Sequence, residues 1–249
     1  MKRIFLLGGR DLEMLTIESL LSACGEPFCD NHLSWHNAAL SAYQSQLNEE
    51  DMFYGIELSE DVVPPEHYVR IDHHNDYAGK KSSLEQVADL LNVTLNRWQK
   101  LVAANDSAYI DGMKALGATD EEILSIRKAD RNAQGVTEEE ELLAQKAIDE
   151  NLTKHGDLLV VKALMPIFSP ICDRLYPYRH LLVYTKRKLV FYGEGQPQLV
   201  ARFQKEIKTG EAFYGGGEKG FFGLADGHFS ADEIMKYVES IIKIITYGV

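Results

Sequence analysis

The sequence predicts an α/β protein with a parallel sheet in its first part, a helical connector in the middle and a smaller α/β domain at the end. Three observations predict it. Apolar strand-like runs alternate with helical patterns in the first third, no strand pattern occurs from about residue 82 to 155, and strand patterns return from residue 157. Such alternation is typical of a parallel sheet with helices on its faces. The corresponding boundaries are 1–115, 116–155 and 156–249.

The elements of the first part follow from the spacing of apolar residues. Continuous apolar runs predict buried parallel strands, and apolar residues three or four apart predict helices. Pro64 and Pro65 mark the loop before the last of these strands. We expect strands at 3–8, 26–30, 52–58 and 68–72, and helices at 12–23 and 36–47.

Helix start and stop signals organise the middle of the chain. Capping boxes predict helix starts at Ser82, Thr119 and Thr137, and Gly117 and Gly135 stand where helices end. We expect helices at 82–92, 95–106, 107–117, 119–135 and 137–152. In the last part, we expect strands at 157–163, 180–185, 188–193, 211–217 and 221–226, with helices at 166–176, 198–207 and 231–245.

The composition indicates which binding partners and which cellular compartment to expect. The formal net charge of −12 argues against non-specific binding to long nucleic acid, which requires many cationic side chains, but it permits a small anionic substrate. Three cysteines without ligand spacing fit a reducing compartment. The first apolar run is too short for a signal sequence, and no run approaches the ~18 residues of a membrane span. We therefore expect a cytoplasmic, soluble protein without a membrane partner.

Acidic and imidazole side chains follow the predicted strands, where an open parallel sheet binds its ligands. They are Asp11 and Glu13 after the first strand, Glu57 after the third, Asp72, His73 and His74 after the fourth, and Asp106 in the stretch AANDSAYI. Each has a structural alternative. Asp11 or Asp106 could cap a helix, Glu57 could be solvated, and a His pair is usually structural. Their joint placement favours a divalent metal such as Mn²⁺.

The stretch IDHH, followed by KSSLEQVADLL, resembles the third motif of the DHH phosphoesterase superfamily. That family combines a parallel-sheet DHH domain, a helical connector and a DHH-associated C-terminal domain, a layout that would cover this whole chain. One branch carries a GGGH stretch in its C-terminal domain, and FYGGGEKGFFGLADG at 213–227 is similar to it. The chain is identified as a divergent member.

The resemblance implies roles for individual residues. The metal ligands would be Asp11, Glu13, Glu57, Asp72, His73 and Asp106, with Asp111 as a weaker choice than Asp106. Asp72, His73 and His74 would act in catalysis, and Gly215, Gly216, Gly217 and Lys219 would contact substrate phosphate. Two departures stand out: Gly9 occupies the usual place of a histidine in the first motif, and Glu218 replaces the histidine of GGGH.

A cationic helix face is left over by this assignment. Arg127, Asp130, Arg131 and Gln134 share one face of the predicted helix 119–135. Arg127 and Arg131 could hold a substrate phosphate, and they could equally belong to an ion-paired structural helix. Three cations at 186–188 in a predicted hairpin turn are expected to be solvated.

Two functions are compatible with these observations. The first is a metal-dependent phosphohydrolase with one or two Mn²⁺ ions, in which a metal-generated hydroxide attacks a small substrate: a short oligonucleotide, a nucleotide phosphate or a polyphosphate. The second is a catalytically impaired protein that binds or senses a nucleotide or phosphate on the same fold. A purely structural role for IDHH is a third interpretation, and the chain could form a homodimer.

Overall fold

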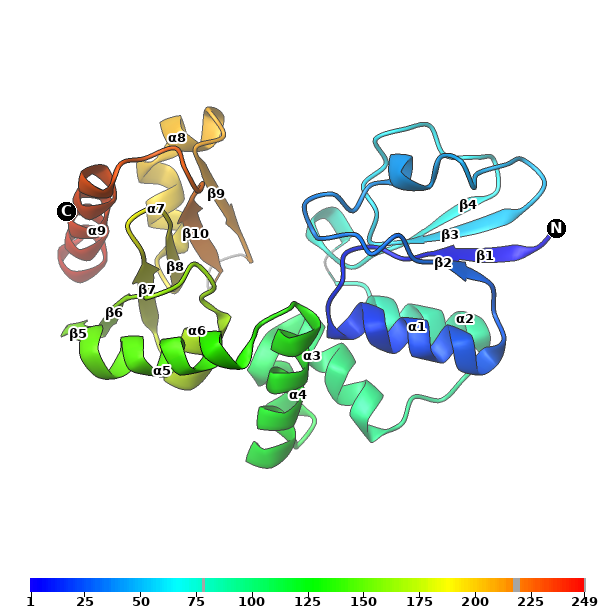
Figure 1. Ribbon diagram of the computed structural model, residues 1–249, viewed down its shortest axis with the longest axis horizontal. Coiled ribbons are helices and arrows are strands. Elements are labelled where there is room, and N and C mark those ends of the chain that lie inside the picture. The colour runs from blue at the N-terminus through cyan, green and yellow to red at the C-terminus, as the bar shows by residue number, and fades with distance from the viewer. Residues whose placement is uncertain (78, 217–219, 249) are drawn as a thin grey trace. The chain divides into compact units, whose positions relative to one another are not determined.

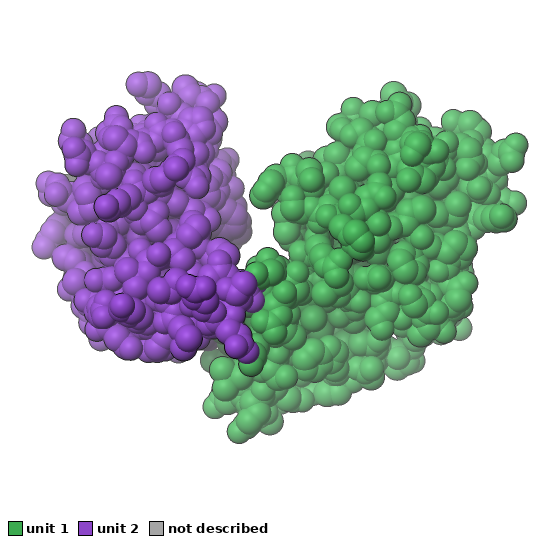
Figure 2. Space-filling view, in the orientation of Figure 1, with its two compact units in different colours: residues 1–135 green, residues 136–249 purple. Residues whose placement is uncertain are grey.

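The computed structural model describes residues 1–77, 79–216 and 220–248. It divides the chain into two compact units, Met1–Gly135 and Val136–Val249 (Figure 2). The first holds a four-stranded sheet and the second a six-stranded sheet. The predicted mixed α/β fold is confirmed. The expected connector, 116–155, is shared between the units, because helix α4 (Asp120–Ala133) belongs to the first and helix α5 (Glu138–Asn151) to the second.

The sheet of the first unit is entirely parallel, as predicted. Its strands occur in the order β2-β1-β3-β4, with the bounds β1 (Arg3–Leu6), β2 (Phe28–Cys29), β3 (Met52–Ile56) and β4 (Tyr68–Ile71). Leu6 is in register with Gly55, and Ile56 with Ile71. The strands therefore end at one edge, where a parallel sheet binds its ligands.

Two kinds of structure cover this sheet (Figure 1). Helices α1 (Leu12–Cys24) and α2 (Ser83–Leu91) lie on one side, and the segment with the 3₁₀ turn η1 (Leu40–Tyr43) covers the other. The helix expected at 36–47 is wrong. The backbone of Ala39 is extended and bridges to Ser59, and the amide of Leu40 donates to the Ser59 carbonyl at 2.8 Å. Pairing with this neighbouring segment replaces the helical hydrogen bonds. Only the short turn η1 forms, and it buries the apolar side chains of Leu40 and Tyr43.

The helices of the middle region begin and end within two residues of the predicted positions. The capping boxes at Ser82, Thr119 and Thr137 are all present, and Gly117 and Gly135 have positive φ values of 68° and 87°. Helix α3 (Arg97–Ala115) contains two residues with non-helical backbone angles, Ala108 and Tyr109. This break corresponds to the boundary expected between helices 95–106 and 107–117. A short 3₁₀ turn, η2 (Asn75–Tyr77), precedes α2.

The second unit is built on a mixed sheet in the order β5-β6-β7-β8-β10-β9. Its strands are β5 (Leu152–His155), β6 (Leu158–Lys162), β7 (His180–Tyr184), β8 (Leu189–Gly193), β9 (Ala212–Gly215) and β10 (Phe221–Leu224), and its other helices are α6 (Ser169–Leu175), α7 (Gln196–Arg202), α8 (Gln204–Lys208) and α9 (Ala231–Tyr247). β6 and β7 are parallel, and the other neighbours are antiparallel.

Two local expectations for this unit are wrong. Residues 152–155 form strand β5, whereas the sequence predicted no strand there, because their sequence LTKH has no apolar pattern and their extended form depends on pairing with β6. The helix expected at 198–207 is broken at Phe203, whose φ and ψ are −110° and 34°. Phe203 turns into the core and stacks on Phe222, with the ring centroids 5.4 Å apart.

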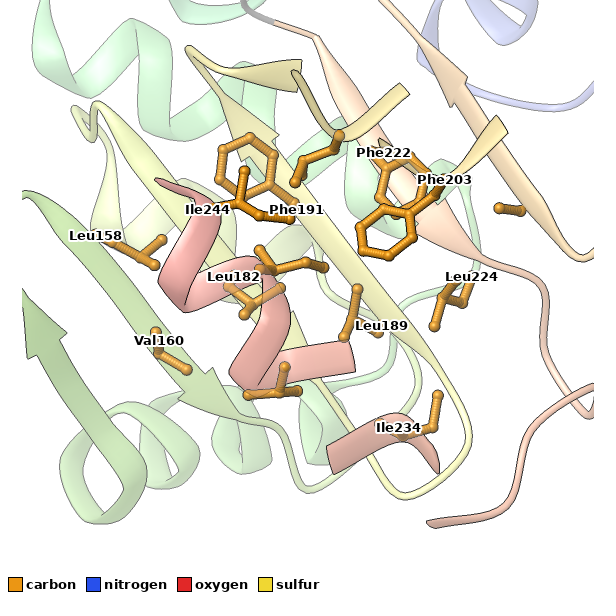
Figure 3. Close-up of a cluster of buried hydrophobic side chains, with 14 residues drawn as sticks. Leu158, Val160, Leu182, Leu189, Phe191, Phe203, Phe222, Leu224, Ile234 and Ile244 are labelled. Carbon is orange, nitrogen blue, oxygen red and sulfur yellow. The ribbon is translucent and has the colours of Figure 1, made fainter. Parts of the chain in front are cut away.

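Apolar side chains fill both faces of the six-stranded sheet. On one face, Phe191, Phe203 and Phe222 meet Ile234 and Ile244 of α9 (Figure 3). On the other face, residues of α5 and α6 pack against β6 and β7. Burying each large apolar side chain contributes about 1.5–3 kcal/mol, so this sheet is held by a core on each side.

Candidate metal centre

Four side chains of the first unit converge at the carboxyl ends of β3 and β4. Glu57, His73, His74 and Asp106 each present one nitrogen or oxygen atom, and these atoms all lie within 4.8 Å of one another. Glu57 directly follows β3, the two histidines come shortly after β4, and Asp106 lies in α3. The sheet edge predicted to hold the site therefore brings together residues that are far apart in the sequence.

The backbone of Glu57 is held in an unusual conformation. Its φ is 52°, in the left-handed region that non-glycine residues rarely adopt. Its amide donates to the carbonyl of Ile71 at 2.9 Å, which ties the end of β3 to the end of β4. Backbone strain of this kind costs about 1–3 kcal/mol and clusters at functional sites. Here it keeps a carboxylate directed into the group rather than along the strand.

Asp72 shapes the loop that carries the two histidines. Its Oδ1 accepts from the amide of His74 at 2.9 Å, and its Oδ2 lies 3.8 Å from Nε of Arg70. Its carbonyl accepts from Nε2 of Gln86 in α2 at 3.1 Å. These contacts turn the chain after β4 so that both imidazoles reach Glu57. The Asp72 carboxylate itself is not among the four convergent groups.

The position of Asp106 depends on the break in α3 and on a buried network beside it. Tyr109, three residues later, has a φ of 54°, and its ring centre lies 4.5 Å from the Arg127 guanidinium. Arg127 donates from Nη1 to Asn105 Oδ1 at 2.9 Å and to Asp130 Oδ2 at 2.7 Å. The network fixes the residue that precedes Asp106, and thus the direction of that turn of the helix.

The convergent atoms approach one another without forming hydrogen bonds. Nε2 of His73 lies 2.6 Å from Oδ2 of Asp106 and 3.5 Å from Oε1 of Glu57, and Nε2 of His74 is also 3.5 Å from Oε1 of Glu57. All four of these buried atoms lack a hydrogen-bond partner in the described part of the chain. Neighbouring ligands of an octahedral ion with bonds of about 2.1 Å lie about 3.0 Å apart. The spacing and the shared direction therefore fit a divalent metal ion.

The charges of the group give the same indication. Burial lowers the pKa of His73, but the carboxylates of Asp106, Glu13 and Glu57 outweigh it and raise that pKa to about 12. Burial raises the pKa of Glu57, but the two histidines hold it at about 2. The imidazoles thus become cations that compensate clustered carboxylates. A bound metal ion would take over this compensation.

Asp11 and Glu13 lie beside the group in different ways. Asp11 caps α1, because its Oδ1 accepts from the amide of Met14 at 2.8 Å, and burial together with the charges of Asp106 and Glu57 raises its pKa. Glu13 accepts from the amide of Leu84 through Oε1, while its Oε2 lies 3.5 Å from His73 Nε2 and has no hydrogen-bond partner among the described residues. Burial raises the pKa of Glu13 as well. Glu13 can therefore support the group from one side, whereas Asp11 serves the helix.

Two of the predicted substrate-binding residues, Arg127 and Arg131, lie in the same unit as this group and are not among its members. Arg127 and Arg131 are 7% and 8% exposed inside the first unit, so they do not form an open cationic face. Gly215 ends β9 and Gly216 follows it in the second unit, whereas Gly217 and Lys219 lie outside the described residues. Their roles stay predictions.

A pocket adjoins the group on the side of His74. Its volume is about 300 Å³, and it shares Glu57, Asp72 and His74 with the site. The rest of its lining is formed by Trp35, His36, Ala38, Leu58, Ser59, Arg70, Asp76 and Tyr77. Sequence reasoning missed Trp35, Arg70 and Tyr77. The available signal was Gly9, because a residue without a side chain in the loop after β1 leaves room for another group.

The comparisons with known proteins bear on the fold. No protein-family model and no curated protein matches the sequence. Solved structures are similar. One, described as the DHH domain of a member of the s1p family of ribosomal proteins, has a TM-score of 0.56 at 12% identity over 99% of this chain and 87% of that one. The pGpG-specific phosphodiesterase PggH from Vibrio cholerae has a TM-score of 0.48 at 14% identity, over 97% and 98%.

RecJ from Thermus thermophilus, solved with Mn²⁺, has a TM-score of 0.48 at 12% identity over 100% of this chain and 52% of its own. Identities this low report on the fold and not on activity. In the described residues, no helix is both long enough and apolar enough to cross a membrane.

Proposed function

The chain has the fold of the DHH phosphoesterase superfamily, and on that premise we propose that it is a metal-dependent phosphohydrolase acting on small phosphorylated substrates. The observation that carries the proposal is the convergence of buried atoms without hydrogen-bond partners from Glu57, His73, His74 and Asp106. Leaving several buried polar atoms without hydrogen bonds costs free energy. A cation at their common point removes that cost.

The donor set indicates the kind of metal. Two imidazoles and two carboxylates suit a borderline divalent ion such as Mn²⁺, and the absence of thiolates from the set disfavours a structural zinc site. When bound, such an ion polarises phosphoryl oxygens and lowers the pKa of water. Glu57, His73, His74 and Asp106 would hold one ion, and Glu13 would accept a hydrogen bond beside it.

The remaining residues of the edge position these groups. Asp72 holds the backbone of His74 in place through Oδ1, and Arg70 donates to the carbonyl of Leu58 at 2.6 Å and to the hydroxyl of Tyr77 at 2.9 Å. Asp72 therefore acts in catalysis through His74 in this proposal. A pocket of about 300 Å³ is at the small end of ligand sites, about 300–1,000 Å³, which supports a small substrate over a long nucleic acid.

The test is Mn²⁺-dependent hydrolysis of bis-p-nitrophenyl phosphate and of a short RNA. We expect turnover by the wild type and a loss of at least about 100-fold in His73→Ala, since losing a ligand weakens the metal and its chemistry together. His228→Ala is the matched control, because His228 is exposed in the second unit. Absence of Mn²⁺-stimulated turnover with all tested substrates would sink the proposal.

A second function has one observation in its favour. Gly9 stands where the superfamily resemblance implies a histidine ligand, and a Cβ atom there would lie 3.0 Å from Cα of Trp35, so this position supplies no imidazole. The chain would then bind a nucleotide or phosphate ligand without turnover. Metal and ligand binding without hydrolysis in the same samples distinguishes this function from the first.

A further inference from the structure

Trp35 contributes an aromatic side chain to the lining of the pocket that adjoins the candidate metal centre. Its indole lines the pocket of about 300 Å³ together with Glu57 and His74. The centres of the Trp35 and His74 rings are 5.2 Å apart at an interplanar angle of 79°, which is an edge contact. The indole is thus next to a proposed metal ligand.

The backbone of Gly9 makes this position of Trp35 available. A Cβ atom at Gly9 would lie 3.0 Å from Cα and 3.1 Å from Cδ2 of Trp35, tighter than ordinary contacts. The loop after β1 therefore carries no side chain at Gly9, where Trp35 packs. Trp35 nevertheless remains 44% exposed as a residue, so contact with Gly9 and His74 does not bury it.

The ring of Tyr77, on another part of the pocket lining, is already engaged. The guanidinium of Arg70 lies 5.0 Å, and the ammonium of Lys80 4.4 Å, from the ring centre of Tyr77. The Tyr77 hydroxyl accepts from Arg70 Nη1. Of the two rings, Trp35 is therefore the one against which no cation packs within the described residues.

We propose that Trp35 is a specificity-determining residue that stacks on a nucleobase, so that the substrate of the site is a nucleotide or a very short oligonucleotide. This inference rests on the proposed function, because the phosphate attached to that base would lie at the metal centre. Every base offers a π face, and stacking on an aromatic side chain is insensitive to base identity. The pocket is small enough to favour one nucleotide unit, and an inorganic polyphosphate would leave the indole unused.

The first test measures nucleotide binding, with the fluorescence of Trp35 as the signal. The chain has two tryptophans, and Trp98→Phe leaves Trp35 as the only one. With Mg²⁺, which does not quench fluorescence, adenosine 5′-monophosphate should change the Trp35 emission saturably. Ribose 5-phosphate, which has the phosphate and sugar but no base, should not change it.

The second test is discrimination between substrates with and without bases. The substrates are a 5′-phosphorylated diadenylate and the same compound lacking both bases. Trp35→Ala should lower kcat/KM for the diadenylate about 5- to 150-fold more than kcat/KM for the base-free compound, the range expected from the loss of one stacked base. Trp35→Phe should retain most of the discrimination.

Trp98→Ala is the matched control, because Trp98 is exposed to a similar extent, 41%, on α3 of the same unit. It should alter neither kcat/KM value. An equal loss with both substrates in Trp35→Ala, beyond that of Trp98→Ala, would overturn the inference, because Trp35 would then act on the metal centre or the fold.

Failure of the inference and failure of the proposed function have different outcomes. If both substrates are hydrolysed and adenosine 5′-monophosphate leaves Trp35 emission unchanged, the inference is overturned and the phosphohydrolase stands. If neither substrate is hydrolysed and the nucleotide alone changes the emission, base recognition by Trp35 is supported and the enzymatic function fails.

Discussion

The His73 imidazole lies among three carboxylates, and this environment has a measurable consequence for metal binding. Without metal, the carboxylates keep its pKa at about 12, so the ring carries a proton at neutral pH. A metal binds only the neutral imidazole, and this proton must leave. Mn²⁺ binding should therefore release about one proton from His73, and affinity should rise with pH.

Isothermal titration calorimetry near neutral pH, in buffers of different ionisation enthalpy, measures this release directly. The observed enthalpy should vary with the buffer, and His73→Asn should release about one proton fewer in addition to binding more weakly. An enthalpy that is the same in all buffers would contradict the assigned charge state of the site.

Individual residues also show what could be predicted from the sequence. Glu57, His73 and Asp106 were predicted from their places near strand ends or an adjoining helix, and the structure brings them together. Asp11 and Asp72 satisfied the same pattern, yet their carboxylates accept backbone hydrogen bonds within their own loops. The position of a residue in the sequence predicts that it lies at the sheet edge, but it does not predict which atoms its carboxylate contacts. Trp35 was missed because its place depends on contact with Gly9, in a separate segment of the chain.

Helix α4 carries buried charged residues that contact α3 next to Asp106. Arg127 bonds Asn105 and Asp130, and the amide of Leu12 lies 3.4 Å from Asp130 Oδ1. Removing the guanidinium takes a cationic partner from a buried carboxylate. Arg127→Ala should therefore lower the free energy of unfolding by about 3–5 kcal/mol, and it should weaken Mn²⁺ binding because Asn105 adjoins Asp106.

Urea unfolding checks this prediction, with Lys128→Ala as the control. Lys128 is the next residue on the same helix and is exposed, so its loss should change the free energy of unfolding by less than about 0.5 kcal/mol. Equal effects of the two substitutions would show that the buried network does not hold α3 and α4 together.

Among the helices and strands, the sequence correctly predicted the features that depend on neighbouring residues alone. The capping boxes at Ser82, Thr119 and Thr137 act within one turn of chain and were confirmed. Two elements were predicted wrongly because partners elsewhere in the chain determine them. The segment 36–47 pairs with Ser59 instead of forming a helix, and β5 is extended because it pairs with β6. Their hydrogen bonds join segments that are separate in the sequence, so the apolar spacing within either segment does not predict them.

For the whole molecule, the account predicts one metal ion per chain. Within the described residues, one group of acidic and imidazole side chains has the spacing of a metal site, and it lies entirely in the unit Met1–Gly135. Asp11 and Asp72, which the resemblance implies as further ligands, each accept a backbone hydrogen bond through Oδ1 and are not members of this group. The chain thus has the fold of a DHH-domain protein, and we expect that fold to hold one metal ion.

The most direct test is a titration of the protein with Mn²⁺, with the free ion followed by electron paramagnetic resonance. The wild type should bind one equivalent per chain. His73→Ala should lose this binding at the same concentrations, and His228→Ala should retain it. Two equivalents in the wild type, or one equivalent that survives in His73→Ala, would contradict a single centre built from Glu57, His73, His74 and Asp106.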